Sequence, residues 1–272
     1  MGQIIHELQD LRHLEWARIR HSSGTAGSFL KSYSDSHGVR TYYKLSDYDS
    51  TRGIVGHECV NEVIVDRLLT MLKIDHLDYT LQHALITLDG RELTTWLCSS
   101  TDFKQRGERK ITLENLYQAM RQEDETPLAF CKRMDWQEYI YEMLIVDYLI
   151  LNRDRHGANI EFLQDVKRKA YRPAPLFDHG LSLVCRCQTE ESLRGIQVME
   201  DKKVQSFVGG NSAAENLLLV PKKSMRRIPA LPQDAGNILM DGLQDILTKR
   251  HRDVILKMIR KRWEYFEDLR HS

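Results

Sequence analysis

Apolar residues alternate with polar ones in the front part of the chain. Residues 79–97 follow this period of two, and Asp89-Gly90 separates the apolar runs 85–88 and 93–97. An Asp-Gly pair between two such runs is the strongest short-range signal for a β-hairpin. Residues 41–45 form another β-favouring run, after a stretch that contains several glycines and serines. The front part therefore predicts strands joined by turns.

A helical period is clear between residues 57 and 73. Its apolar side chains recur at spacings of three and four, which places them on one face of a helix. These residues are Val60, Val63, Ile64, Leu68, Met71 and Leu72. Glu58 and Glu62 are four residues apart and share another face. We predict a helix with one apolar stripe and a separate acidic face.

The rear part of the chain has mainly helical periodicity. Residues 113–121, 136–151 and 254–269 read as helices, with only a short β-like interruption near 159–178. The change from strand-like to helical periodicity falls near residues 96–100. We predict an α+β fold of two lobes, with a small β-rich N-lobe at residues 1–97 and a larger helical C-lobe at residues 98–272.

Composition and charge narrow the class of protein. The 272 residues are 42% hydrophobic and 29% charged, which is typical of a folded chain long enough for two modest cores. The 39 basic residues balance 39 acidic ones, so we expect neither nucleic acid nor a membrane as a direct partner. Five irregularly spaced cysteines favour reduced thiols, and residues 1–10 lack the apolar run of a secretory signal. We expect a cytoplasmic protein.

Two polar segments follow the most apolar of the predicted helices. The first is Asn-Arg-Asp-Arg-His-Gly-Ala-Asn at 152–159, and the second is Pro-Leu-Phe-Asp-His-Gly at 175–180. Phosphoryl transfer needs a carboxylate that orients the attacking hydroxyl, and oxygen ligands that hold Mg²⁺ against the phosphates. Asp154, Asn159 and Asp178 supply these groups. In protein kinases four residues separate the catalytic Asp from the metal-binding Asn, and Asp154 and Asn159 have this spacing.

These residues resemble the catalytic loops of the HipA-type serine/threonine kinases. That family has an Asp, a nearby His and an Asn in its loop, with a metal-binding Asp about twenty residues later. Asp154, His156, Asn159 and Asp178 match this pattern. The resemblance implies a bilobal protein-kinase-like fold, ATP and Mg²⁺ as cofactors, and a protein Ser or Thr hydroxyl as the acceptor. It gives Asp154 and His156 catalytic roles, His156 through a phosphate oxygen, and makes Asn159 and Asp178 the metal ligands.

The resemblance extends into both predicted lobes. Asn61-Glu62 is similar to a pair in the family's small-lobe helix, and residues 111–120 resemble the helix that opens its large lobe. Lys44 takes the place of the lysine that contacts the ATP phosphates, a role that suits a compact cation. Glu62 is the first choice for the acidic partner of Lys44, and Glu58 is the alternative.

The remaining nucleotide contacts also follow from the resemblance. Residues 22–28 resemble the family's phosphate loop, where small residues let backbone N–H groups approach an anion. The loop residues expected to bind phosphate are Ser23, Gly24, Gly27 and Ser28. Adenine is expected against residues 96–99, with Leu97 and Cys98 as contacts. By analogy, Ser23 or Ser28 is an expected site of self-phosphorylation.

The acceptor and the partners stay open. Lipid kinases share the pattern Asp-Arg-His-x-x-Asn found at 154–159, so a lipid or small-molecule acceptor is an alternative to a protein. A non-catalytic nucleotide-binding regulator is a third hypothesis. HipA toxins carry an additional small N-terminal domain, whereas about 20 residues precede the expected phosphate loop here. An antitoxin-like or other regulatory protein is therefore a possible partner, but the contacts that the additional domain makes in HipA toxins assign no partner-binding residues in this sequence.

Overall fold

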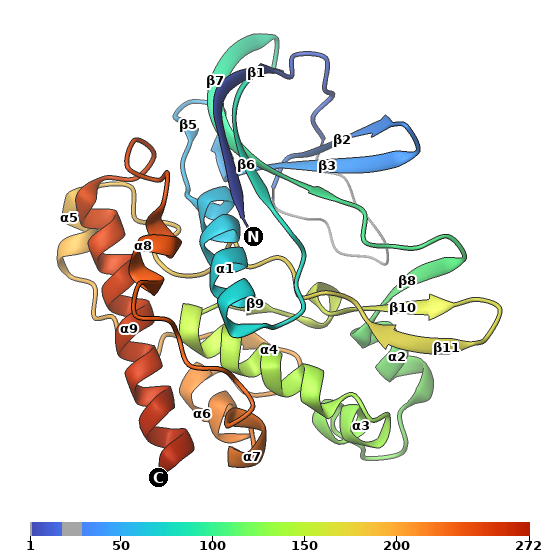
Figure 1. The fold of residues 1–272 in the computed structure, drawn as a ribbon. Helices are drawn as coiled ribbons and strands as arrows, with labels where there is room; N and C mark the ends of the chain where they lie inside the picture. The colour runs from blue at the N-terminus through green and yellow to red at the C-terminus, as the bar shows by residue number, and fades with distance from the viewer. Residues whose placement is uncertain (1, 18–28) are drawn as a thin grey trace.

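The computed structural model describes residues 2–17 and 29–272. The expected phosphate-loop residues Ser23, Gly24, Gly27 and Ser28 lie outside this described part of the chain. Figure 1 shows a sheet-rich lobe built from the front of the sequence and a larger, mostly helical lobe. The predicted α+β fold of two lobes is confirmed.

A mixed five-stranded sheet forms most of the N-lobe. Its order is β1-β6-β7-β3-β2, with β1 (Gln3–Asp10), β2 (Lys31–Ser36), β3 (Val39–Leu45), β6 (Thr80–Leu88) and β7 (Arg91–Thr101). The predicted hairpin is β6 and β7. Asp89 and Gly90 both have positive φ, 50° and 74°, which a two-residue hairpin turn that matches the strand twist requires. β7 pairs with β6 along one edge and with β3 along the other, and the chain leaves the sheet after Thr101.

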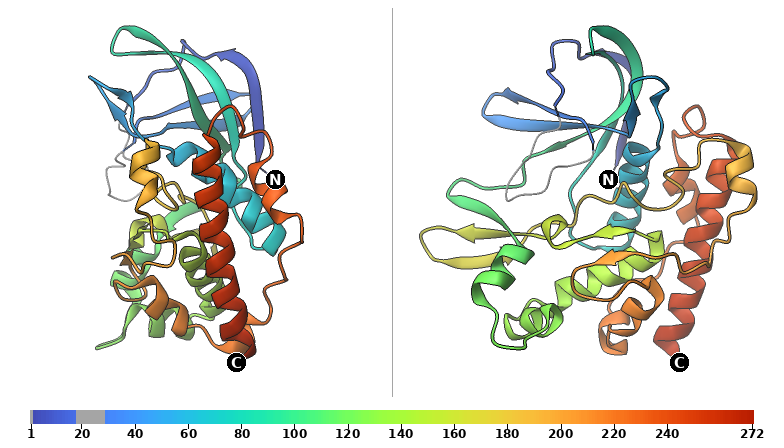
Figure 2. Two further views of the ribbon diagram at one scale, coloured as in Figure 1. Left: turned by 90° about the vertical axis from the view of Figure 1, so that its left-hand side faces the viewer. Right: turned by 180° about the vertical axis from the view of Figure 1, so that it is seen from behind.

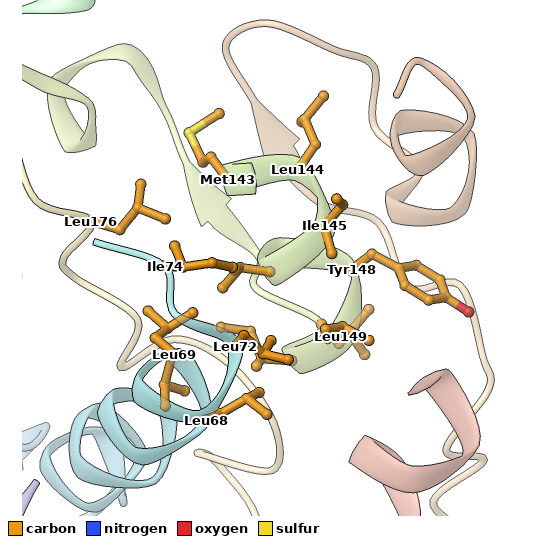
Figure 3. Packing of buried hydrophobic residues seen from close by; sticks show 14 of the residues in the cluster. Leu68, Leu69, Leu72, Ile74, Met143, Leu144, Ile145, Tyr148, Leu149 and Leu176 are labelled. Carbon is orange, nitrogen blue, oxygen red and sulfur yellow. The ribbon is translucent and has the colours of Figure 1, made fainter. Parts of the chain in front are cut away.

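The helix α1 (Glu58–Leu72) lies between the sheet and the C-lobe (Figures 1 and 2). It follows the short strands β4 (Tyr48–Asp49) and β5 (Gly53–Ile54). Figure 3 shows its leucines at 68, 69 and 72 packed beside apolar residues of the C-lobe. Five of its polar residues are almost fully buried as well, and they are Glu58, Asn61, Glu62, Asp66 and Arg67. Buried polar groups need partners, so α1 does more than fill the core.

Both ends of α1 are attached to the C-lobe. Before its first turn, the ring of His57 lies edge-on to the ring of His251, with centroids 5.0 Å apart. Toward its other end, the Arg67 guanidinium donates hydrogen bonds to the carbonyls of Leu239 and Asp241. The helix is therefore held against the C-lobe at two points along its length.

The C-lobe combines small sheets with helices. One sheet has the order β11-β10-β8, from β8 (Glu108–Thr112), β10 (Glu161–Asp165) and β11 (Ala170–Pro173). In the second, β9 (Asp154–Arg155) pairs in parallel with β12 (Gln205–Ser206). The helices are α2 (Leu113–Met120), α3 (Pro127–Arg133), α4 (Gln137–Ile150), the 3-10 helix η1 (Gly157–Asn159), α5 (Glu190–Arg194), α6 (Ala213–Leu218), α7 (Lys222–Met225), α8 (Ala235–Met240) and α9 (Lys249–His271).

The helix α4 runs through the core of the C-lobe. Most of its residues are buried, and it packs against α6, α7 and α9. It ends at Leu151, whose φ of 50° reverses the backbone direction. The polar segment 152–159 follows directly, so a buried helix positions this segment beneath the N-lobe. Within the described ranges, no helix has both the length and the apolar character needed to cross a membrane.

Candidate active site

A cavity of about 480 Å³ lies between the two lobes. The sequence-predicted residues that line it are Lys44, Cys98, Asp154, His156, Asn159 and Asp178. The carboxylates of Asp154 and Asp178 therefore share one cavity, although 24 positions separate them in the sequence. The volume is in the range of sites that bind small molecules.

Lys44 binds two carboxylates in the wall of this cavity. Its Nζ is 2.8 Å from Oε1 of Glu62 and 2.6 Å from Oδ1 of Asp178. Glu58, the alternative partner, instead accepts a hydrogen bond from the Asp47 N–H. Lys44 thus joins the sheet to α1 and to the segment that carries Asp178.

These ion pairs set the charge of both Lys44 and Asp178. Burial alone lowers the pKa of Lys44, but the carboxylates of Asp178 and Glu62 outweigh burial and raise this pKa well above its usual value. Burial raises the pKa of Asp178, but Lys44 and Lys31 outweigh it and hold this pKa far below its usual value. At neutral pH the site therefore presents a cation and an anion, as phosphate and Mg²⁺ binding require.

Asp154 and His156 lie close to each other in the polar segment 152–159. The His156 Nδ1 accepts a hydrogen bond from the Ala158 N–H, which leaves the proton of the neutral ring on Nε2. This Nε2 is 3.7 Å from Oδ1 of Asp154. Burial raises the pKa of Asp154, although His156 opposes the shift. A carboxylate with a raised pKa is better suited to accept a proton from a hydroxyl group.

Asn159 and Asp178 offer a pair of oxygen ligands. The Asn159 Nδ2 donates to the backbone carbonyl of Asp154 at 3.0 Å, so Oδ1 is the amide atom left for a cation. Asp178 has a φ of 58°, a left-handed conformation that few non-glycine residues adopt and that clusters at functional sites. One carboxylate and one amide oxygen suit Mg²⁺, which prefers oxygen ligands and keeps several waters. The residues present therefore fit this metal.

Arg155 joins the two segments that carry these ligands. Its buried guanidinium pairs with the Asp147 carboxylate of α4 at 3.0 and 3.1 Å. Its Nη1 also donates to the carbonyls of Asn159 at 3.1 Å and Phe177 at 2.8 Å. One side chain thus binds the backbone at Asn159 and at the residue directly before Asp178. An Asp inside an apolar helix, eight residues before an Arg, is the sequence signal for this pair.

Lys31 is a further cation in the cavity that the sequence analysis does not single out. It lies directly opposite Lys44 in the antiparallel ladder between β2 and β3, and both residues line the cavity. Residues directly opposite in such a ladder point to the same face of the sheet. The register of β2 against β3 identifies Lys31, and the sequence alone does not fix that register.

The residues expected to contact adenine lie only partly in the cavity. Cys98 lines it, whereas Leu97 is packed with Leu45 and Ala84 in a separate apolar cluster. Successive strand residues point to opposite faces, so Leu97 and Cys98 cannot both face the same cavity. The other residues of this part of the chain that line the cavity are Ser100, Asp102, Phe103 and Lys104. The lining therefore continues past the expected 96–99 segment.

Aromatic rings surround this end of the cavity. The rings of Phe103 and Phe177 have centroids 5.9 Å apart, and both residues line the cavity. The Lys110 Nζ is 4.0 Å from the Phe103 ring centroid and 3.0 Å from Oδ1 of Asp102. This arrangement holds Phe103 in place and provides flat apolar surfaces suited to a planar base.

Comparison with known proteins bears on the fold. No protein-family model matches the sequence, and no curated protein matches it. Among solved structures, the chain is similar to the proinflammatory kinase CtkA of Helicobacter pylori, with a TM-score of 0.68 and 16% sequence identity over 96% of each chain. Likeness at this identity shows the fold alone, so the relation to HipA-type kinases stays a prediction. The chain has a kinase-like fold of two lobes.

Proposed function

We propose that this protein is an ATP-dependent kinase that transfers the γ-phosphoryl group of MgATP to the Ser or Thr hydroxyl of a protein. The observation that carries the proposal is the arrangement of Lys44, Asp154, Asn159 and Asp178 around one cavity, from segments far apart in the sequence. The kinase-like fold is a separate support. The chemistry of these side chains assigns each a role.

Lys44 and Lys31 bind the phosphates of ATP. Both line the cavity from the same face of the β2–β3 ladder, and ammonium groups are effective partners for phosphate oxygens. The ion pair with Glu62 holds the Lys44 ammonium in the cavity wall. Its position is therefore set before nucleotide binds.

Asn159 and Asp178 hold Mg²⁺ through an amide oxygen and a carboxylate oxygen. When bound, Mg²⁺ neutralises the negative charge of the phosphates during transfer. Arg155 fixes the backbone at Asn159 and next to Asp178, so the two ligands keep their relative position. Preorganised ligands of this kind lose little entropy when the metal binds.

Asp154 orients the acceptor hydroxyl and accepts its proton. The hydroxyl oxygen forms a bond to the γ-phosphorus, the bond from this phosphorus to the bridging oxygen of ADP breaks, and the proton passes to the Asp154 carboxylate. The His156 Nε2–H donates a hydrogen bond to an oxygen of the transferred group. The raised pKa of Asp154 favours the proton transfer.

A lipid or small-molecule kinase is the second candidate, because the Asp-Arg-His-x-x-Asn pattern at 154–159 is shared with such enzymes. Incubation with γ-labelled ATP and whole-cell protein, in parallel with lipid and metabolite extracts, separates the two. Label on protein supports the proposed acceptor. Label only on small molecules would leave a kinase with a different acceptor.

We also propose a reducing, cytoplasmic location for the protein. All five cysteines are free thiols, and Cys59, Cys98, Cys131 and Cys185 are buried. A chain that folds without disulfides is typical of reducing compartments.

The variant Asp154→Ala tests the mechanism. Turnover is expected to fall by roughly 10²- to 10⁴-fold because the variant lacks the group that accepts the proton, while ATP still binds. Asp253→Ala, at an exposed position of α9, is the matched control and should keep full turnover. Unchanged turnover in Asp154→Ala would remove this residue from the mechanism.

A further inference from the structure

The segment that carries Asp178 is attached to α1 through Asn61. The Asn61 Nδ2 donates hydrogen bonds to the carbonyls of Gly180 at 3.0 Å and Ser182 at 2.9 Å. Asn61 is only 1% exposed, and more than 100 residues separate it from both acceptors in the sequence. A helix of the N-lobe therefore fixes a loop of the C-lobe.

Residues of α1 close to Asn61 also contact the same loop. The Glu62 Oε2 accepts a hydrogen bond from the His179 N–H at 2.8 Å. A Cβ added to Gly180 would lie 3.0 Å from the Cβ of Glu58 and 3.2 Å from its carbonyl oxygen. A side chain at this position would therefore require the neighbouring atoms of α1 to shift by a few tenths of an ångström. The loop thus lies close against α1 directly after the left-handed Asp178.

The polar character of this contact has a cost in stability. Among the described residues, the buried atoms without a hydrogen-bond partner include Asn61 Oδ1, Ser182 Oγ and His179 Nε2. Each such atom costs on the order of 1–3 kcal/mol. Well-packed apolar side chains would avoid this cost, so the contact is not optimised for stability. Buried polar atoms without partners are unfavourable for stability, and such unfavourable features are expected at functional sites.

We propose that Asn61 is a positioning residue for the metal-binding loop: its amide fixes the backbone of residues 180–182 and thereby sets the direction of the Asp178 carboxylate. The inference rests on the proposed function, because it assigns Asp178 to Mg²⁺. An amide is the suitable group, since its two N–H donors reach two carbonyls at once. A carboxylate of the same size has no donor, and an alanine has neither reach nor donor.

Removal of this amide should weaken metal binding more than nucleotide binding. Without Asn61, the carbonyls of Gly180 and Ser182 lose their partner and the loop samples other paths. Asp178 then has to be ordered when the metal binds, which lowers the affinity. ATP without metal still meets Lys31 and Lys44, because the ion pair with Glu62 still holds the Lys44 ammonium in the cavity wall.

Two measurements on Asn61→Ala test the proposal. Calorimetry should show the half-saturating Mg²⁺ concentration for ATP binding raised at least about tenfold, with ATP affinity in EDTA changed less than about twofold. In the metal-free protein, amide hydrogen exchange of residues 178–182 should accelerate. Asn61→Ser, which keeps one donor, should give an intermediate shift and serves if the alanine variant does not fold.

Leu68→Ala is the matched control, because it removes apolar packing from the same helix without touching the loop. It should lower the melting temperature yet leave the Mg²⁺ dependence unchanged. Equal Mg²⁺ dependence in wild type and Asn61→Ala overturns the inference and leaves the proposed function standing. Absence of Mg²⁺-dependent ATP binding in the wild type overturns both.

Discussion

Lys31 and Lys44 lie directly opposite each other on β2 and β3, and both line the cavity between the lobes. Like charges in this position repel each other and destabilise the strand pair. Glu62 and Asp178 neutralise Lys44, while Lys31 adds positive charge that depresses the pKa of Asp178. Such a pair becomes favourable when a polyanion lies between the two ammonium groups.

The variant Lys31→Met should bind ATP about tenfold more weakly, which corresponds to about 1.4 kcal/mol. Thermal stability without nucleotide should be unchanged or higher, because the cross-strand repulsion is lost. Calorimetry and thermal unfolding measure the two effects. Lys167→Met, at an exposed turn, is the control that should change neither. Equal ATP affinity in all three proteins would exclude Lys31 from phosphate binding.

The variant Lys44→Met should change how stability depends on pH. In the wild type the pKa of Asp178 is depressed. The stability that ionised Asp178 contributes is therefore fully present at pH values above the ordinary Asp pKa, and it is lost only as the pH falls through the depressed pKa of the folded state. In the variant, Asp178 lacks the cation that most strongly depresses its pKa, while burial, which raises this pKa, remains. The folded variant then binds protons more tightly than the folded wild type, so it gains stability relative to the wild type as pH falls from 7 toward 5.

Thermal unfolding of wild type and Lys44→Met at pH 7 and pH 5 checks this expectation. The difference in melting temperature between the two proteins should shrink at the lower pH. A difference that stays constant would mean that Lys44 does not control the protonation of the carboxylates around it.

The variant Arg155→Met leaves the Asp147 carboxylate buried without its cation and should cost about 3–5 kcal/mol of unfolding free energy. The double variant Arg155→Met/Asp147→Leu should recover part of this loss. Mg²⁺-dependent ATP binding should stay weak in both, because the hydrogen bonds to the Asn159 and Phe177 carbonyls are absent. Urea unfolding and calorimetry separate these effects. Full recovery of binding in the double variant would limit Arg155 to a stabilising role.

The variants Phe103→Ala and Leu97→Val distinguish the two ends of the expected adenine segment. Phe103→Ala should raise the KM for ATP several-fold, because it removes one of the rings that line the cavity. Leu97→Val should cost about 1 kcal/mol of stability and leave this KM unchanged, because Leu97 lies in the apolar cluster. Steady-state kinetics at varied ATP measures both. A raised KM for ATP in Leu97→Val, with an unchanged KM in Phe103→Ala, would place the adenine base against Leu97.

Strong local periodicity made much of the fold predictable. The helix predicted at 57–73 is α1 (Glu58–Leu72), and the Asp89-Gly90 hairpin forms as expected. β1 was not predicted, because its stabilisation comes from parallel pairing with residues of β6 that lie 75 to 77 positions later in the chain. The short helices α5 to α8 carry too few residues to show a period, so packing rather than local sequence determines them.

Some residues of the candidate site are likewise predictable from local sequence, whereas others depend on long-range contacts. Asp154, His156 and Asn159 lie on one short segment, so spacing alone groups them, and the structure brings them to one cavity with Asp178. The roles of Lys31 and Arg155 depend on strand register and on contacts across the lobe, which one sequence does not reveal. The side of β7 that Leu97 faces depends on register as well.

The attachment of α1 at His57 and Arg67 bears on how an activity of this kind is controlled. Movement of α1 away from the C-lobe has to break both contacts, and these contacts hold the helix where Glu62 pairs with Lys44. Under the proposed function, a signal that acts by moving this helix has to separate these contacts first.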